Sequence, residues 1–356
     1  MELILLHCRP GFEKECAAEI CFRGDTAGIP GYARTEPRQG FVAFHPHDPG
    51  GARRLYESLP LDALIFARQW FVATPELKGL PTADRISPLV NRLETLETGF
   101  GGLLIETPDT NEGKSLSRLA RKLAPPLRAA LARGGLWHPG EPRLPRAHLL
   151  LTGGQSAYAG FSREGYSARW PQGIPRLRLP AAAPSRAVLK LEEALLTFLD
   201  SEERHHLLRE GRTAVDLGAA PGGWSWLLTR RGLQVTAVDN GNLLRELARS
   251  PQIEHLRVDG FTYRPAHPVH WLVCDMVEKP RRVATLMAEW FARGWCERAL
   301  FNLKLPMKRR FDEAQQCLNL VRKQLSSRED DYTLRARQLY HDREEITVYL
   351  APGGQE

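Results

Sequence analysis

Apolar and polar positions in the first 70 residues alternate between the period of a strand and that of a helix. The runs that predict strands are 3–6 and 40–45, and those with helical spacing are 12–22 and 55–67. These elements predict a small α+β unit over residues 1–70. Met1–Cys8 has a short apolar run without a basic lead-in, so we expect a strand there and not a signal peptide.

A second α+β unit is predicted over residues 71–165. Its expected strands are 69–74, 102–106 and 147–152, and its expected helices are 83–96 and 116–133. Pro125-Pro126 is expected to break the second helix. Residues 166–184 contain four prolines and are interpreted as a linker.

From Ser185 to the end of the chain, helical and strand-like runs alternate. This order is typical of an α/β domain with a mostly parallel sheet, here over 185–356. One run, Asp216-Leu-Gly-Ala-Ala-Pro-Gly-Gly-Trp224, predicts a strand that ends in a glycine turn and continues into a helix. Such a turn lets the backbone approach a ligand closely at the carboxyl edge of the sheet.

Composition narrows the protein class. A chain of 356 residues with 42% hydrophobic content can form two or three packed domains. No apolar run reaches the roughly 18 residues of a membrane span. The six cysteines form no C-x-x-C pair, so we expect reduced thiols in a cytoplasmic protein and no metal site.

Positive charge is concentrated in one segment. Between Lys114 and Arg178 there are twelve Lys/Arg and two acids, Glu141 and Glu164. That segment sums to +10, and because the whole chain carries +7, the rest sums to −3. Nucleic acid is one interpretation, and a solvated helix face followed by a basic linker is the other.

Aromatic residues occur among these arginines. Phe161, Tyr166 and Trp170 are interleaved with Arg163 and Arg169. They could stack on bases, or they could pack the edge of a sheet.

The glycine turn is expected to bind an adenosine-like cofactor. Gly218, Gly222 and Gly223 do not satisfy G-x-G-x-x-G, the dinucleotide fingerprint. Asp239 ends the next strand and could accept from both ribose hydroxyls. Asp259 is expected to end a third strand, where it could accept from an adenine amino group. S-adenosylmethionine fits this pattern, and a dinucleotide site with an unusual turn or a purely structural turn are the alternatives.

Four charged residues at expected strand ends or a helix start are the catalytic candidates: Lys190, Asp275, Lys304 and Glu345. Each alone could be an ordinary solvated end. Together they would place two lysines and two acids around one cleft. A lysine with a lowered pKa could take the proton of a ribose hydroxyl as it attacks a methyl sulfonium.

Several motifs resemble the FtsJ-type ribose 2′-O-methyltransferases. The four candidates match that family's Lys-Asp-Lys-Glu tetrad, and 216–224 matches its cofactor motif. Further matching segments are 9–16, 184–186, 189–193, 273–280, 301–308 and 339–345, so the resemblance reaches both ends of the chain. It is strongest to members that act on 23S rRNA.

The resemblance implies a Rossmann-like, class I methyltransferase domain with a seven-stranded sheet, preceded by ferredoxin-like and THUMP RNA-binding parts. It implies methyl transfer from S-adenosylmethionine to the ribose 2′-OH of one cytidine in 23S rRNA or a large-subunit precursor. We expect the protein to act as a monomer in the cytoplasm. Lys304 would be the proton acceptor. The implied cofactor contacts are Ser185, Gly218, Ala220, Pro221, Gly222, Gly223, Trp224, Asp239, Asp259 and Asp275.

Some alternatives stay open at this point. Glu344 adjoins Glu345, and Glu345 fits the tetrad better because Ile-Thr-Val follows it. A non-catalytic RNA-binding or ribosome-assembly factor is the second functional hypothesis. Methylation of a base or of a small molecule is the third.

Overall fold

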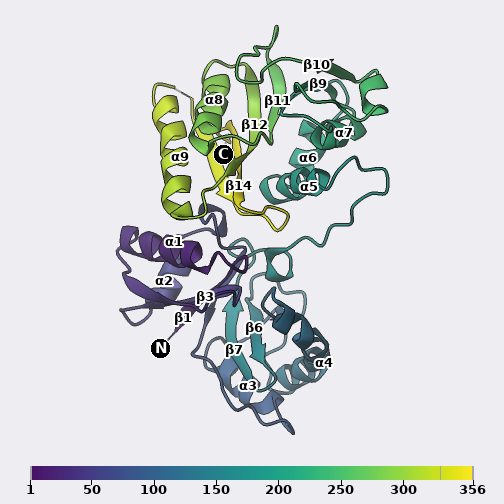
Figure 1. Ribbon diagram of the computed structural model, residues 1–356. Helices are drawn as coiled ribbons and strands as arrows, with labels where there is room; N and C mark the ends of the chain where they lie inside the picture. The colour runs from purple at the N-terminus through teal and green to yellow at the C-terminus, as the bar shows by residue number, and fades with distance from the viewer. Residues whose placement is uncertain (1, 329, 355–356) are drawn as a thin grey trace. The chain divides into compact units, whose positions relative to one another are not determined.

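The computed structural model describes residues 2–328 and 330–354. The chain divides into two compact units, Met1–Pro175 and Arg176–Glu356, each built around its own seven-stranded sheet (Figure 1). The division falls inside the stretch predicted as a linker. Among the described residues, no helix is both long and apolar enough to cross a bilayer.

The first unit has one continuous sheet in the order β2-β3-β1-β4-β7-β6-β5. Its strands are β1 Leu3–His7, β2 Gly31–Arg34, β3 Phe41–Pro46, β4 Gln69–Ala73, β5 Gly102–Glu106, β6 Arg146–Gly153 and β7 Ser156–Ser162. Its helices are α1 Glu13–Thr26, α2 Gly51–Ser58, α3 Ile86–Glu94 and α4 Asn111–Arg133. The predicted boundary between residues 70 and 71 falls within β4, so both predicted N-terminal parts contribute strands to the same sheet.

The second unit has the sheet order β10-β9-β8-β11-β12-β14-β13. Its strands are β8 Thr213–Leu217, β9 Gln234–Val238, β10 Ile253–Leu256, β11 Val269–Cys274, β12 Cys296–Lys304, β13 Tyr332–Arg337 and β14 Glu345–Pro352. Its helices are α5 Ala187–Phe198, α6 Ser201–Leu207, α7 Gly223–Arg230, α8 Pro280–Ala292 and α9 Arg310–Leu325.

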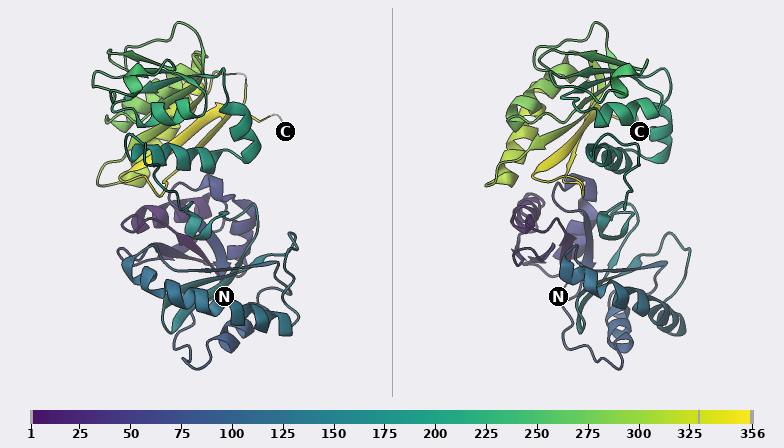
Figure 2. Two further views of the ribbon diagram at one scale, coloured as in Figure 1. Left: turned by 90° about the vertical axis from the view of Figure 1, so that its right-hand side faces the viewer. Right: turned by 45° about the vertical axis from the view of Figure 1, so that its right-hand side comes forward.

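Five neighbouring strands of this second sheet, from β10 to β12, are parallel, and β14 runs antiparallel to both its neighbours. Helices α8 and α9 lie on one face of the sheet and α5 and α7 on the other (Figure 1), and the right-hand view of Figure 2 shows the same layers. The predicted mostly parallel, Rossmann-like α/β fold is therefore confirmed. Carboxyl ends of parallel strands meet at one edge, and this edge positions the candidate site.

Helix α4 corrects the prediction of a break at Pro125-Pro126. It is one helix over Asn111–Arg133 with both prolines inside it. Leu123, Leu127 and Leu131 form a buried stripe that continues on both sides of the prolines. Packing along this stripe compensates for the backbone hydrogen bonds that proline cannot donate.

Two smaller predictions also need correction, and burial decides between the two alternatives left open for Phe161. The helix expected over 55–67 is α2 followed by a short 3-10 turn at Leu61–Ala63, because Pro60 cannot continue the helix. The strand expected to end at Asp259 ends at Leu256, and Asp259 instead accepts a hydrogen bond from the Phe261 amide in a turn (2.9 Å). Phe161 is fully buried in β7, so it packs the sheet and does not face solvent.

Candidate active site

The four predicted catalytic residues come together at the carboxyl edge of the second sheet. Asp275 follows the last residue of β11, and Lys304 is the last residue of β12. Glu345 begins β14, which runs antiparallel to β12, so that Lys304 and Glu345 are register partners. Lys190 reaches the same place from the first turns of α5.

These side chains form a closed ring of ion pairs. Asp275 contacts both lysines: its Oδ2 lies 3.3 Å from Lys190 Nζ, and its Oδ1 accepts from Lys304 Nζ. Glu345 also contacts both lysines, with Oε1 toward Lys190 and Oε2 toward Lys304. Two positive and two negative charges therefore balance in a largely buried place, as a stable buried ion-pair network requires.

The charges of the ring set the protonation of its members. Burial raises the pKa of Asp275, but Lys304 and Lys190 outweigh burial, and the net shift is downward. Burial lowers the pKa of Lys304, but the negative charges of Asp275 and Glu345 outweigh it, and the net shift is upward. The expectation of a lysine with a lowered pKa is wrong for the protein by itself, where Lys304 is an ammonium group held by two carboxylates.

Glu344 and Glu345 have different surroundings. Glu344 forms a 2.6 Å ion pair with Arg310, and about half of its side chain is exposed. Glu345 is buried and contacts both lysines. The structure therefore brings Glu345, and not Glu344, into the ring.

Three polar residues that the sequence analysis missed support the ring from beneath. Asn302 Nδ2 donates to Asp275 Oδ1 (3.0 Å), and Asn302 Oδ1 accepts from Thr347 Oγ1 (2.8 Å). Thr347 Oγ1 also lies 3.0 Å from Asp342 Oδ2. Burial raises the pKa of Asp342 well above its usual range, with Glu345 adding to the shift. Strand alternation was the available signal for Asn302, because it lies two residues before Lys304 in β12 and thus on the same face.

A cavity of about 460 Å³ adjoins the ring. Of the predicted cofactor residues, Gly218, Ala220, Asp239, Asp259 and Asp275 line it. Asp239 is held by two backbone amides, since Ala220 N donates to Oδ2 (2.9 Å) and Gly241 N to Oδ1 (2.6 Å). Gly218 has φ +78°, and a Cβ there would come within 2.6 Å of Met276 Cγ. The turn therefore needs glycine at this position.

The remaining predicted cofactor residues lie beside the cavity and not in its lining, as far as residues 2–328 and 330–354 show. Gly223 begins α7, and a Cβ there would come within 2.5 Å of Ser185 Oγ. Ser185 Oγ is buried without a hydrogen-bond partner in the described part of the chain. Trp224 lies in the hydrophobic core and donates from Nε1 to the Ala187 carbonyl (2.9 Å). Pro221 and Gly222 complete the turn.

Asp216 is a further buried carboxyl beneath the turn. Burial raises its pKa to about 7, and the charges of Asp275 and Asp239 add to the shift. Ser225 Oγ donates to its Oδ2 (2.7 Å) and opposes the shift. Asp216 thus anchors the start of α7 from inside the fold.

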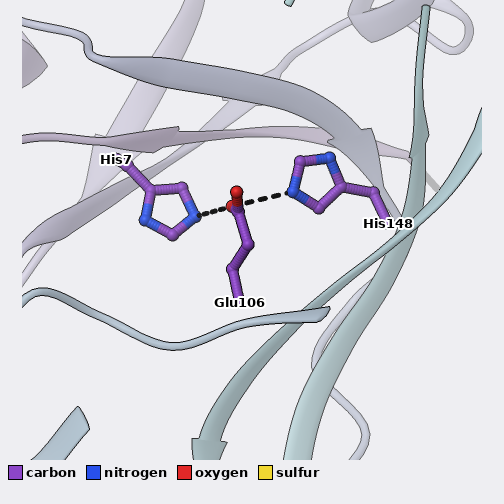
Figure 3. A group of neighbouring side chains, drawn as sticks. All are labelled: His7, Glu106 and His148. Carbon is purple, nitrogen blue, oxygen red and sulfur yellow. Dashed lines mark hydrogen bonds and ion pairs between the residues drawn. The ribbon is translucent and has the colours of Figure 1, made fainter. Parts of the chain in front are cut away.

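Unit 1 holds a separate buried cluster, His7, Glu106 and His148 (Figure 3). Nε2 of each histidine lies 2.8 Å from Glu106 Oε2, and the Gln172 amide donates to Oε1 (2.6 Å). Burial raises the pKa of Glu106, but His148 and His7 outweigh burial and lower it, so the carboxylate is ionised. Tetrahedral zinc with bonds of about 2.0–2.1 Å would hold its ligand atoms roughly 3.3 Å apart. The shorter 2.8 Å contacts fit a direct hydrogen bond between His148 and the carboxylate and an ion-pair contact with His7.

The solvent face of α4 carries the basic charge noted in the sequence. Lys114, Arg118, Arg121 and Lys122 are all exposed. The opposite face packs against α3, β5 and β6. This arrangement leaves the four cations free to meet a polyanion.

Comparison with protein families gives three matches along the chain. The model described as "RlmM ferredoxin-like domain" matches residues 1–71. The model described as "Ribosomal RNA large subunit methyltransferase M, N-terminal" matches 84–163. The FtsJ-like methyltransferase model matches 183–331.

Curated relatives match over nearly the whole chain. Ribosomal RNA large subunit methyltransferase M of Azoarcus sp. (strain BH72) is 48% identical over 347 residues, 98% of this chain and 95% of that protein. The protein of the same name from Methylococcus capsulatus is 50% identical over 347 residues, 98% of this chain and 97% of that protein. Among solved structures, TrmN from Thermus thermophilus aligns over 98% of this chain and 99% of its own at 15% identity, with a TM-score of 0.34. That likeness is too slight to support an inference.

Proposed function

The chain belongs to the ribosomal RNA large subunit methyltransferase M family, and on that premise we propose that it methylates the ribose 2′-oxygen of a single cytidine in 23S rRNA. The observation that carries the proposal is the closed ring of Lys190, Asp275, Lys304 and Glu345. A ribose hydroxyl is a very weak acid, so its methylation needs a group that holds and removes a proton. A base-ring nitrogen with a free lone pair would need no such group.

S-adenosylmethionine is the proposed methyl donor. Asp239 at the end of β9 would hold the ribose, and Asp259 the adenine amino group. The free hydroxyl of Ser185 and the start of α7 suit the carboxylate of the methionine part. When bound, the cofactor supplies a methyl group on a sulfonium, whose positive charge lowers the pKa of a neighbouring ammonium.

The ring performs two tasks in this proposal. Asp275 and Glu345 fix Lys304 Nζ in place, so that the amine meets the 2′-hydroxyl in a defined direction. Lys190 shares both carboxylates, and its positive charge reduces the negative potential that holds the proton on Lys304. Lys304 would first release its own proton to solvent as its pKa falls, and the neutral amine would then accept the hydroxyl proton.

The proposed substrate is 23S rRNA or its large-subunit precursor, which implies action in the cytoplasm. The exposed cations of α4 would bind RNA phosphates. The parts over 1–70 and 71–165 would serve binding, and residues 185–356 the chemistry. We propose that a monomer suffices, because all four ring residues come from one chain.

Mapping of ribose methylation in 23S rRNA from cells with and without this protein tests the proposal. We expect one cytidine to lose its 2′-O-methyl group in the knockout. Wild-type protein should restore it, whereas Lys304→Ala should lower the transfer rate by at least about 100-fold. An unchanged map, or a methyl group found on a base after nuclease digestion and mass spectrometry, would contradict the proposal.

A further inference from the structure

Two apolar side chains near the ring are exposed to an unusual degree. Val277 is 91% exposed and Met307 is 73% exposed, whereas the other exposed large apolar residues among those described reach at most 46%. Single exposed apolar residues are common on protein surfaces. It is the position of these two that indicates a binding role.

Both side chains lie just beyond catalytic candidates. Val277 follows Asp275 by two residues, and Met307 follows Lys304 by three. β11 and β12 are parallel neighbours with Cys274 opposite Phe301, so both chains leave the sheet at the same edge. Val277 also lines the cavity that contains Asp239 and Asp275.

Neighbouring contacts hold the two loops in place. Met276 packs against the glycine turn, since a Cβ on Gly218 would meet its Cγ at 2.6 Å. The side chain of Met276 is thus held against the turn, whereas the side chain of the next residue, Val277, points into solvent. In the second loop, the Leu305 amide donates to the Glu344 carbonyl (2.7 Å), two residues before Met307. The exposed apolar groups thus project from anchored backbone.

Each loop also presents a lysine. Lys279 and Lys308 are exposed, and across the described ranges neither side chain has an ion-pair partner. The adjoining cations are neutralised, because Arg281 pairs with Glu313 (2.8 Å) and Arg282 with Glu278 (2.6 Å). Each loop therefore offers one apolar group and one free positive charge.

A nucleotide at this site would need that combination. Its 2′-oxygen lies between the base, on one neighbouring ribose carbon, and the 3′-phosphate, on the other. A nucleotide whose 2′-oxygen reaches Lys304 must therefore place its base and phosphate beside the ring. Apolar side chains such as methionine insert beside bases and hold them unstacked, and lysines bind phosphate as point charges.

We propose that Val277 and Met307 form an apolar wedge that holds the acceptor nucleotide unstacked, while Lys279 and Lys308 bind its flanking phosphates. This inference rests on the proposed function. Valine and methionine offer the base edge no hydrogen bond, so the wedge positions the nucleotide without reading its identity. RNA shape and contacts elsewhere select the cytidine.

The test uses the full chain and an rRNA fragment that contains the methylated cytidine, replaced in one preparation by a fluorescent cytidine analogue. Unstacking of the analogue raises its fluorescence, and this signal needs no methyl transfer. The test variant is Val277→Thr/Met307→Gln, which keeps side-chain size while adding polarity. Leu320→Gln, an exposed leucine on α9, is the matched control.

We expect the double variant to lose most of the fluorescence rise and to transfer methyl about 10- to 100-fold more slowly, the range that one base contact contributes. Its melting temperature should equal that of wild type, and rates are compared at saturating S-adenosylmethionine because Val277 lines the cofactor cavity. Lys279→Gln/Lys308→Gln should instead weaken RNA binding and reduce its salt dependence.

Two outcomes separate the wedge from the function on which it rests. If wild type methylates the fragment and the Val277→Thr/Met307→Gln protein matches it in rate and fluorescence, the wedge is wrong and the proposed function stands. If wild type transfers no methyl group to ribose, the proposed function fails, and the wedge fails with it.

Discussion

Adjacent glutamates in this chain have different roles because β14 begins at Glu345, and Glu344 lies in the bend just before it. Glu345 contacts both lysines of the ring, whereas Glu344 pairs with Arg310 at the surface. The pair therefore offers a test in which two variants differ by one position and carry the same chemical change.

We expect Glu345→Gln to slow methyl transfer by about tenfold or more, because Lys304 loses one of the two groups that orient it. The substitution also removes a negative charge that raises the pKa of Lys304. A lower pKa moves the rising limb of the rate against pH toward lower pH. Pre-steady-state rates measured across a pH series should show both effects in Glu345→Gln. An equal shift in Glu344→Gln would contradict the assignment.

The buried carboxyl of Asp216 predicts a pH-dependent stability. Its pKa is about 7 in the fold and about 3.9 in an unfolded chain. Because the folded state binds the proton more tightly, the stability contributed by the neutral carboxyl is complete below pH about 4. It is lost as pH rises through 7, at up to about 1.4 kcal/mol per pH unit.

Asp216→Asn cannot ionise, and its amide oxygen can still accept from Ser225. We expect the difference in unfolding free energy, variant minus wild type, to increase between pH about 4 and 7. Above pH 7 the difference should stay constant. Urea unfolding at a series of pH values measures the difference. Asp312→Asn, on an exposed side chain, is the control and should give a nearly constant difference. A constant difference for Asp216→Asn too would show that Asp216 is ionised throughout.

At the scale of elements, helix α4 shows how packing overrides a local breaker. Pro125 and Pro126 are exposed, and the buried stripe on the other face carries the helix past them. We expect Pro125→Ala to raise the unfolding free energy of the protein by about 1–3 kcal/mol, since proline disfavours a helix interior by roughly that amount. Leu127→Ala should lower it by about 2–5 kcal/mol by leaving a cavity. Denaturant titrations would check both signs.

Most long elements were predictable because their apolar pattern agrees with their burial. β5 was predicted at its observed bounds, and β1, β3, β4 and β6 within about one residue. β2 and β7 were missed, since Gly31–Arg34 is short and half exposed and Ser156–Ser162 is rich in small residues. Neither has a clear apolar alternation.

The same reasoning explains which site residues could be foreseen. The ring residues stand at strand ends or a helix start, where charge interrupts an apolar run. Asp342 and Thr347 support the ring through tertiary contacts that no local spacing encodes. The buried cluster joins residues that lie far apart in the sequence, His7, Glu106 and His148. Predicting it would have required the strand order, which local apolar and polar spacing does not reveal.

At the scale of the whole molecule, basic charge and chemistry reside in different units. The exposed cations of α4 belong to Met1–Pro175, and the ring belongs to Arg176–Glu356. We expect Lys114→Gln/Arg118→Gln to weaken rRNA binding and to reduce the slope of log affinity against log salt by about 1.4–1.8, or 0.7–0.9 per lost phosphate contact. Filter binding over a salt series measures the slope.

A variant with the same charge change is available within the same unit. Lys14→Gln/Arg54→Gln removes two exposed cations from α1 and α2, outside the basic segment. It should leave the slope within error of wild type. An equal loss of slope in both variants would mean that net charge, and not α4, governs binding.

The buried Glu106 has a consequence for how this protein can diverge. It joins His7, within the part that matches one family model, to His148, within the part that matches another. A recombinant that receives residues 1–71 from a relative keeps the buried carboxylate of Glu106. If the incoming strand has no polar partner at position 7, Glu106 loses one of its two contacts with histidine, which destabilises the buried charge. We therefore expect the substitutions tolerated at positions 7 and 106 to depend on each other, across the boundary between the two family matches.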